Sequence, residues 1–277
     1  MHLIEQAPLV VVGAAFMAAL LLAYALAVRV GRRQGQKQGG GDALGYLLSS
    51  ALGLLGLLMA FTFNAAQERF RLRQDLVVAE ANAIGTSYLR VQMLGSPWRE
   101  ELSGELLRYA ETRERFVNAS NPAQLAATSG DSAAVQDAIW RDLSEALKAN
   151  VTPDLNLALM LTINDMFDQG AASRAARETH VPAAILRSLL YYSIVVAFLL
   201  GLTDSGEQRW TGILIGVLLL LTLAYCLILD LDRPVSGTVR VSAAPMHRAL
   251  TDIQKSEAAK HPEQTPSGRP LGPSRSP

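Results

Sequence analysis

The carboxylate with the least usual setting is Glu80, in the stretch LVVAEANAIGTSYLR (residues 76–90). Glu80 follows Val77 by three residues and precedes Ile84 by four, so in a helix it shares their apolar face. A carboxylate on a buried face needs a cationic partner. Three arginines are the candidates: Arg73 on the same helix, and Arg174 and Arg177 further along the chain. We interpret Glu80 first as half of a salt bridge that sets the helix register, and second as an ion-binding or gating group.

Three amide and carboxylate side chains extend this expected polar network: Asn82, Asn164 and Asp168. Asn82 lies among small residues, which favours a hydrogen bond across a close helix contact. Asn164 and Asp168 are one helical turn apart and could address one ligand or one neighbouring helix. A hard cation needs about six oxygen ligands, so this pair is too small for a metal site.

No residue pattern in the chain indicates catalysis. The four histidines (His2, His180, His247 and His261) lack metal-ligand spacing, and the chain has no glycine-rich phosphate loop or nucleophile elbow. We therefore predict no catalytic residue, no metal, no cofactor and no enzyme activity. The 25 basic and 25 acidic residues balance, which argues against a nucleic-acid partner. The single cysteine, Cys226, excludes an intrachain disulfide.

Half of the residues are hydrophobic, and they gather in four long blocks. A bilayer core about 30 Å thick needs about 20 apolar residues of helix. Four stretches meet this requirement: 7–28, 43–63, 181–202 and 210–229. No Lys or Arg precedes the first stretch and several follow it, so we interpret it as a retained span rather than a signal peptide. The predicted fold is an all-α integral membrane protein with four transmembrane helices.

The chain divides into four predicted parts. They are a transmembrane hairpin (1–65), a soluble helical region (66–180), a second transmembrane hairpin (181–230), and a membrane-proximal segment with a disordered tail (231–277). The soluble region alternates polar and apolar residues with helical period and shows almost no strand signal. The tail is too rich in Pro, Ser and Gly to bury a core.

Four helices are expected in the soluble region. The first continues from the second span, and the second begins at Ser96 as N-cap, with Pro97 at the first position. The third covers 133–150 and the fourth follows Pro153. Residues 120–132 have the composition of a linker.

The second span carries small residues at intervals of four: Gly45, Ser49 and Gly53. Small residues let helices approach closely in a membrane, where packing replaces the hydrophobic drive. This ladder predicts either packing within one subunit or contact around a ring of subunits. Phe61 and Phe63, at the far end of the span, could form an apolar constriction that gates a pore by dewetting, or could face lipid.

Charges mark the predicted membrane boundaries: Arg187, Asp230, Asp232 and Arg233. A lipid-facing arginine costs about 3 kcal/mol, so we expect Arg187 to snorkel or to form an interfacial salt bridge. Asp230 and Asp232 are expected to pair with Arg233. An even number of spans places both termini on one side. The summed flanking charges favour the cytoplasm for that side, although arginines in the first loop favour the opposite orientation.

Three segments together resemble the bacterial four-span membrane family described as bestrophin-like: AFTFNAAQERFRLRQDLVVAEANAIGTSYLR, LTINDMFDQGAASRAARETHVP and LILDLDRPVSGTVRVSAAP. The resemblance covers most of the chain from the second span to about Pro245, and EANAIGT and DLDRPxxG are its most specific motifs. It implies a bacterial inner-membrane location and a ring-shaped, pentameric ion channel. The second span would line the pore, and the helical region and termini would be cytoplasmic. The chain lacks the acidic calcium clasp of the animal channels, so calcium gating is not implied.

The leading hypothesis is therefore an oligomeric ion channel whose second span lines the pore. Its partners would be the lipid bilayer, inorganic ions and further copies of the chain. The alternative is a membrane-anchored sensor or scaffold whose helical region binds a ligand or a protein. A secondary transporter is less favoured, because the four spans carry few intramembrane polar residues.

Overall fold

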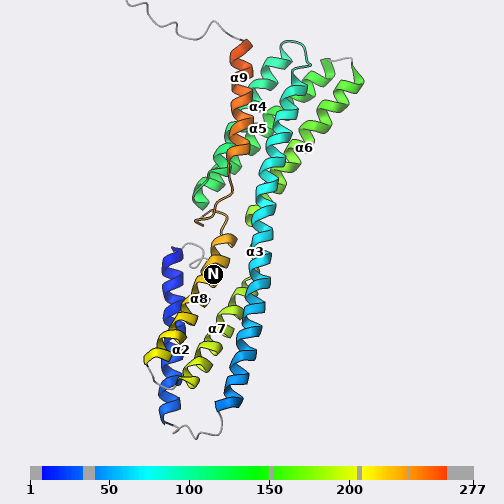
Figure 1. Cartoon of the computed structure of the whole chain (residues 1–277). Coiled ribbons are helices and arrows are strands. Elements are labelled where there is room, and N and C mark those ends of the chain that lie inside the picture. The colour runs from blue at the N-terminus through cyan, green and yellow to red at the C-terminus, as the bar shows by residue number, and fades with distance from the viewer. Residues whose placement is uncertain (1–7, 34–40, 150–151, 205–207, 236, 261–277) are drawn as a thin grey trace, which may run out of the picture. The chain divides into compact units, whose positions relative to one another are not determined.

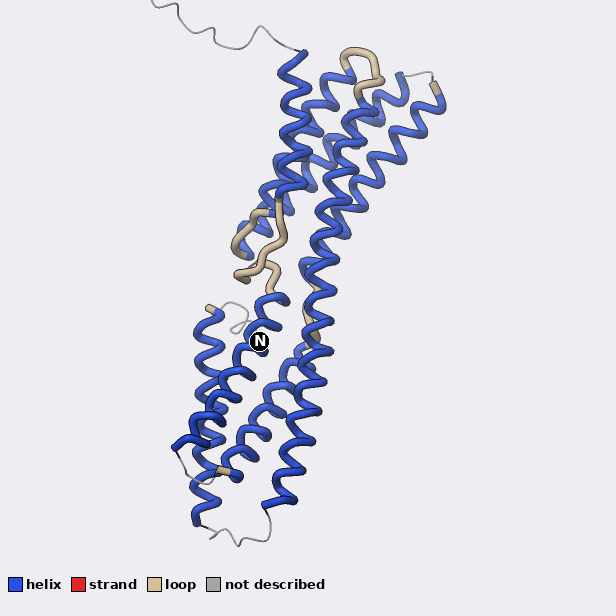
Figure 2. Tube along the Cα trace, in the orientation of Figure 1, coloured by secondary structure: helices blue, strands red, loops and turns tan. Residues whose placement is uncertain are grey.

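The computed structural model describes residues 8–33, 41–149, 152–204, 208–235 and 237–260. Within these ranges every regular element is an α-helix (Figures 1 and 2). In chain order the helices are α2 (Leu9–Arg33), α3 (Gly41–Val91), α4 (Trp98–Val117), α5 (Pro122–Ala149), α6 (Pro153–Glu178), α7 (Ala183–Thr203), α8 (Gln208–Asp232) and α9 (Ala244–Lys260). Four helical stretches are long and apolar enough to cross a membrane, which confirms the predicted all-α, four-span architecture.

The chain forms two compact units. The first unit comprises Met1–Val77, Ala119–Ala126 and Gln169–Ser242, and the second comprises Val78–Asn118, Ala127–Asp168 and Ala243–Pro277. The first unit therefore holds α2, α7, α8 and the apolar part of α3. The second holds the end of α3, all of α4 and α9, and most of α5 and α6.

The first unit is built by close contact between apolar helices. Its helix α7 approaches α2 at Gly201, where a Cβ atom would lie 2.4 Å from the backbone oxygen of Tyr24 and 2.7 Å from the Cβ of Ala27. Nearby in the same unit, the rings of Phe16 and Tyr225 stack with centroids 4.3 Å apart. In lipid the hydrophobic effect does not drive helices together, so van der Waals contacts from such close packing stabilise their association instead.

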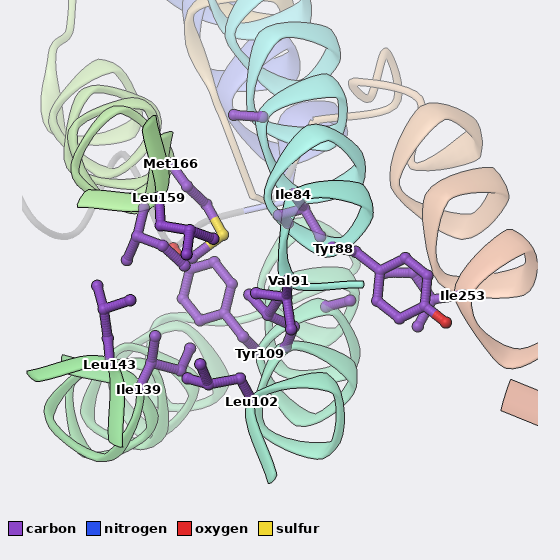
Figure 3. Close-up of a cluster of buried hydrophobic side chains, with 14 of the residues drawn as sticks. Ile84, Tyr88, Val91, Leu102, Tyr109, Ile139, Leu143, Leu159, Met166 and Ile253 are labelled. Carbon is purple, nitrogen blue, oxygen red and sulfur yellow. The ribbon is translucent and has the colours of Figure 1, made fainter. Parts of the chain in front are cut away.

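The second unit has a hydrophobic core to which five helices contribute, α3, α4, α5, α6 and α9 (Figure 3). On α4 the buried residues Leu102, Leu106 and Tyr109 recur at intervals of four and three, which places them on one face. The Tyr109 ring lies near the centre of the cluster and meets Phe167 of α6 edge-on, with centroids 6.1 Å apart. The expectation that the helices of the 66–180 region pack together is confirmed.

The predicted linker over 120–132 is wrong, because α5 begins at Pro122. The side-chain oxygen of Asn121 accepts a hydrogen bond from the backbone N–H of Gln124 at 2.8 Å, as an N-cap residue does. Proline suits the first helical position because its missing N–H would have no partner there. A capped helix start therefore overrides the linker-like composition.

The helix α9 is a second difference from the sequence-based prediction, which assigns 231–277 to a membrane-proximal segment and a tail. Met246, Leu250 and Ile253 of α9 are buried. Their intervals of four and three are a helical signal that is legible in the sequence. The remainder of the predicted disordered tail, 261–277, lies outside the described residues.

Candidate functional site

Glu80 pairs with Arg113 of α4 inside the second unit. Both side chains are fully buried. The Arg113 guanidinium donates to both carboxylate oxygens, with Nη2 3.0 Å from Oε2. It also lies over the ring of Phe116, 4.0 Å from the ring centre. In such a bidentate salt bridge, each buried charge is compensated by the opposite charge in place of water. The expectation that an arginine pairs with Glu80 is thus confirmed.

The identity of that arginine corrects the sequence-based expectation, which named Arg73, Arg174 and Arg177. Arg113 lies on the buried face of α4, four residues after Tyr109 and three before Phe116. A cation at that spacing within an apolar face is the signal that could have found it. Neither side chain of the pair has exposed surface, so we interpret the pair as a structural brace, that is, a buried salt bridge that holds α3 and α4 together.

Arg73 instead connects the ends of two helices in the first unit. Its buried guanidinium donates to the backbone oxygens of Ala176 at 3.1 Å and Thr179 at 2.8 Å, at the end of α6. It also donates to the backbone oxygens of Leu231 and Asp232 at the end of α8, both at 3.3 Å. The carbonyls at the end of a helix lack intrahelical hydrogen-bond donors and carry partial negative charge. A buried arginine there supplies the missing donors and a compensating positive charge.

The two aspartates at the end of α8 organise the chain around them. The Asp232 carboxylate accepts a hydrogen bond from the backbone N–H of Val181 at 2.7 Å, just before α7. The Asp230 carboxylate accepts one from the backbone N–H of Thr238 at 2.6 Å. A Cβ on Gly237 would lie 2.7 Å from the Asp230 backbone oxygen, so this turn requires glycine. These contacts explain why the DLDRPVSGT segment carries aspartate at 230 and 232 and glycine at 237.

The other polar residues named from the sequence do not join Glu80. Asn164 donates to Asp168 at 3.1 Å on the exposed surface of α6. Arg174 is half-buried on α6. Arg187 is exposed on α7, and its Nε donates to the Ala183 backbone oxygen at 3.3 Å. The expected pairing of Arg233 stays a prediction. Across the described residues, no group of three or more His, Cys, Asp or Glu is placed to hold a metal ion.

The small-residue ladder of α3 faces away from the rest of its own chain. A Cβ on Gly45, Gly53 or Gly56 would meet nothing within 4 Å. Ser49 is exposed, and its hydroxyl donates to the Gly45 backbone oxygen of its own helix. Among the described residues, no side chain or backbone atom of the same chain therefore packs against these glycines, and contact around a ring of subunits stays a prediction.

Further along α3, the open side of the helix carries large apolar side chains. Leu54, Leu57 and Phe61 are 46%, 50% and 65% exposed. Leu55 is buried on another face, in the core of the first unit. Phe63 is half-buried and packs against that core, so of the two phenylalanines only Phe61 presents a large open surface.

The second unit contains a groove of about 590 Å³ between α3 and α9. Asn82 and Leu89 of α3 line it, as do Arg248 and Asp252 of α9. Asn82 is exposed there rather than hydrogen-bonded across a helix contact within the chain. The groove thus combines an apolar floor with a few polar and charged groups.

A polar latch holds the far end of α9 against α3. The Tyr88 hydroxyl donates to the Glu257 carboxylate at 2.5 Å, and the Lys260 ammonium donates to the Tyr88 hydroxyl at 3.2 Å. Lys260 also donates to Gln92. Burial lowers the pKa of Lys260, but its hydrogen bonds and charge interactions with Glu257 and Tyr88 together outweigh burial, so the pKa is raised. The latch therefore keeps its cation at neutral pH.

These features define an all-α, four-span membrane protein whose second span is largely open. A family model for the bestrophin-like domain matches residues 14–246, so the chain belongs to the bestrophin-like family and the resemblance drawn from its sequence is confirmed. No curated protein sequence gives a significant match.

Solved structures share this fold. One is a variant of a bacterial bestrophin homologue from Klebsiella pneumoniae, which is 14% identical, covers 92% of this chain and 98% of its own, and has a TM-score of 0.62. Another variant of that homologue is 15% identical, with coverages of 86% and 98% and a TM-score of 0.62. At such identities the likeness shows the fold alone.

Proposed function

We propose that the chain is the subunit of an oligomeric ion channel in the bacterial inner membrane, with α3 lining the pore. The family resemblance implies a channel and a ring of five copies. Both termini would lie in the cytoplasm. The observation that supports the proposal best is the open surface of α3, since α2, α7 and α8 pack on one another and leave the α3 span the least buried of the four.

Two unpartnered stripes run along the membrane-spanning part of α3. One is the small-residue ladder, and the other carries Leu54, Leu57 and Phe61. Each helical residue advances about 100° around the axis, so the mean directions of the two sets differ by roughly a third of a turn, and Leu57 follows Gly53 by four residues where the two sets adjoin. In a ring of copies, one stripe can contact the neighbouring subunit while the other faces the central axis.

The large-residue stripe suits a pore that opens by wetting. A narrow passage lined by Leu and Phe excludes water, and ions cannot shed their hydration there until it widens. Beyond Phe61 the same side of α3 exposes Asn64 and Glu68, whose polar groups would line a wider, hydrated part of the pathway. Ion conduction of this kind needs no catalytic residue.

Ion flux into liposomes tests the proposal. Phe61→Ser should raise the flux above that of the parent, because a hydroxyl at the constriction favours water. The matched control is Tyr191→Ser, which alters an aromatic residue of α7 that is 64% exposed, similar to Phe61 at 65%. The control should conduct like the parent, because α7 would face lipid.

Two results would count against a pore lined by α3. One is an oligomer without ion flux in the parent and in Phe61→Ser, which would favour the sensor or scaffold alternative. The other is an equal increase from Tyr191→Ser, which would indicate a general leak rather than an opened constriction.

A further inference from the structure

The second unit presents two separate apolar surfaces. One is the α3–α9 groove, where Leu89 is 68% exposed. The other is the outer face of α6, where Leu157 and Leu161 are 53% and 58% exposed. Large contiguous apolar surfaces on soluble units usually mark contacts with a partner. The partner has to be identified from the placement and charge of the two surfaces.

The direction of α9 sets the position of Arg248 along the groove. Tyr88 contacts Glu257, and Gln92 contacts Lys260, so α9 runs parallel to α3. Arg248 precedes Glu257 by nine residues, or about 13 Å along the helix. Nine residues before Tyr88 is Ala79, which lies about 5 Å along the helix from Asn82. Arg248 and Asn82 therefore lie near the same level of the groove, and Leu89 lies at its other end.

The direction of α6 sets the levels on the second surface. Arg90 donates to the Ala158 backbone oxygen at 3.0 Å, and Ser87 donates to that of Thr162 at 3.4 Å, so α6 runs antiparallel to α3. By the same register, Leu161 is level with Leu89. Asp168, seven residues further along α6, is about level with Asn82, and therefore with Arg248.

We propose that the α3–α9 groove of one copy receives the outer face of α6 from a neighbouring copy. Rotation about an axis parallel to the helices leaves every level unchanged, so a ring requires matching groups at equal levels on two different faces. The two surfaces meet this condition. Leu161 is level with Leu89, and the acidic Asp168 is level with the basic Arg248. This inference rests on the proposed oligomer and names the faces that form it.

Crosslinking between copies tests the contact. Both chains carry Cys226→Ser, and two differently tagged chains are co-expressed, one with Leu89→Cys and the other with Leu161→Cys. Disulfides need Cα atoms within about 7 Å. Mild oxidation should therefore join the two tags. The matched control replaces Leu161→Cys by Leu157→Cys, which lies on the same exposed face of α6 but about 6 Å away along the helix, and it should crosslink less.

Exchanging the charges of Arg248 and Asp168 provides a second test, which does not depend on the folding of the cysteine variants. Arg248→Asp and Asp168→Arg should each weaken the oligomer, and the double variant should restore it, because the charges then attract again. Native mass spectrometry reads the number of copies in every case.

The outcomes separate the inference from the proposed function. Suppose that the oligomer is intact but no disulfide forms between the Leu89→Cys chain and the Leu161→Cys chain, or that Leu89→Cys chains crosslink only to one another. Either result overturns the choice of faces and leaves the channel proposal standing. A parent that is monomeric in native lipid overturns both.

Discussion

The two units use exposed apolar side chains differently. In the first unit, α8 exposes Leu219, Leu220 and Leu223, as expected for a helix that faces lipid tails. In the second unit, most large apolar side chains converge on one core, and most of the exposed ones lie along α3 beside the α3–α9 groove or on the outer face of α6. Exposure of leucine is therefore uninformative in a predicted span. In a unit predicted to lie in water, it points to a missing partner.

The units also differ in how they satisfy buried charge. The second unit places Glu80 and Arg113 against each other, so each charge has a counter-charge. The first unit surrounds Arg73 with backbone oxygens at the ends of two helices, where partial charges replace a carboxylate as the nearest contacts. The backbone oxygens at helix ends can thus stabilise a buried arginine without a carboxylate among its nearest contacts.

Removing half of the buried pair should have the largest effect. Glu80→Leu leaves the Arg113 charge buried without its carboxylate, which typically costs about 3–5 kcal/mol. Glu80→Gln should also destabilise, because an amide lacks the charge and one of the two acceptor oxygens. Thermal unfolding in detergent measures both. The control is Arg99→Gln, which breaks a solvent-exposed pair with Glu100 and should hardly change the unfolding temperature. A shift from Glu80→Leu no larger than this control would contradict the brace.

A smaller effect is expected where helices touch in the first unit. Gly201→Ala pushes a methyl group against the backbone of α2, and such overpacking typically costs about 1–3 kcal/mol. The matched control is Gly216→Ala on α8, where a Cβ would meet nothing within 4 Å. This control should be neutral or stabilising, because alanine has the better helix propensity. Equal unfolding temperatures for both variants would show that α2 and α7 are not held this closely.

The smallest effect is expected at the latch between α3 and α9. Lys260→Met removes an ammonium that contacts Tyr88, Gln92 and Glu257. A partly exposed interaction of this kind contributes at most about 1 kcal/mol. Amide hydrogen exchange should therefore quicken at the end of α9 while global stability hardly changes. Lys255→Met, which alters an exposed lysine of the same helix, should leave the exchange rates unchanged. A similar increase in that variant would show that the faster exchange does not come from loss of the Lys260 contacts.

The sequence by itself determined the elements whose signal is local. An apolar run of about 20 residues predicts a span without knowledge of its neighbours, and four such runs predicted the class of fold. The continuation of the second span into one long helix and the start of another at Pro153 were also legible. Helical spacing placed Glu80 on a buried face and so required a cation beside it.

Only the tertiary structure decided which surfaces meet. Periodicity gives the face on which a side chain lies but not the helix that covers that face, so it could not choose Arg113 over Arg73 as the partner of Glu80. It likewise could not show that Gly201 touches α2 while Gly53 faces open space, since both are glycines in apolar helices. The physical reason is that burial and pairing depend on contacts between residues far apart in the chain, whereas helix formation and membrane insertion depend on residues close together.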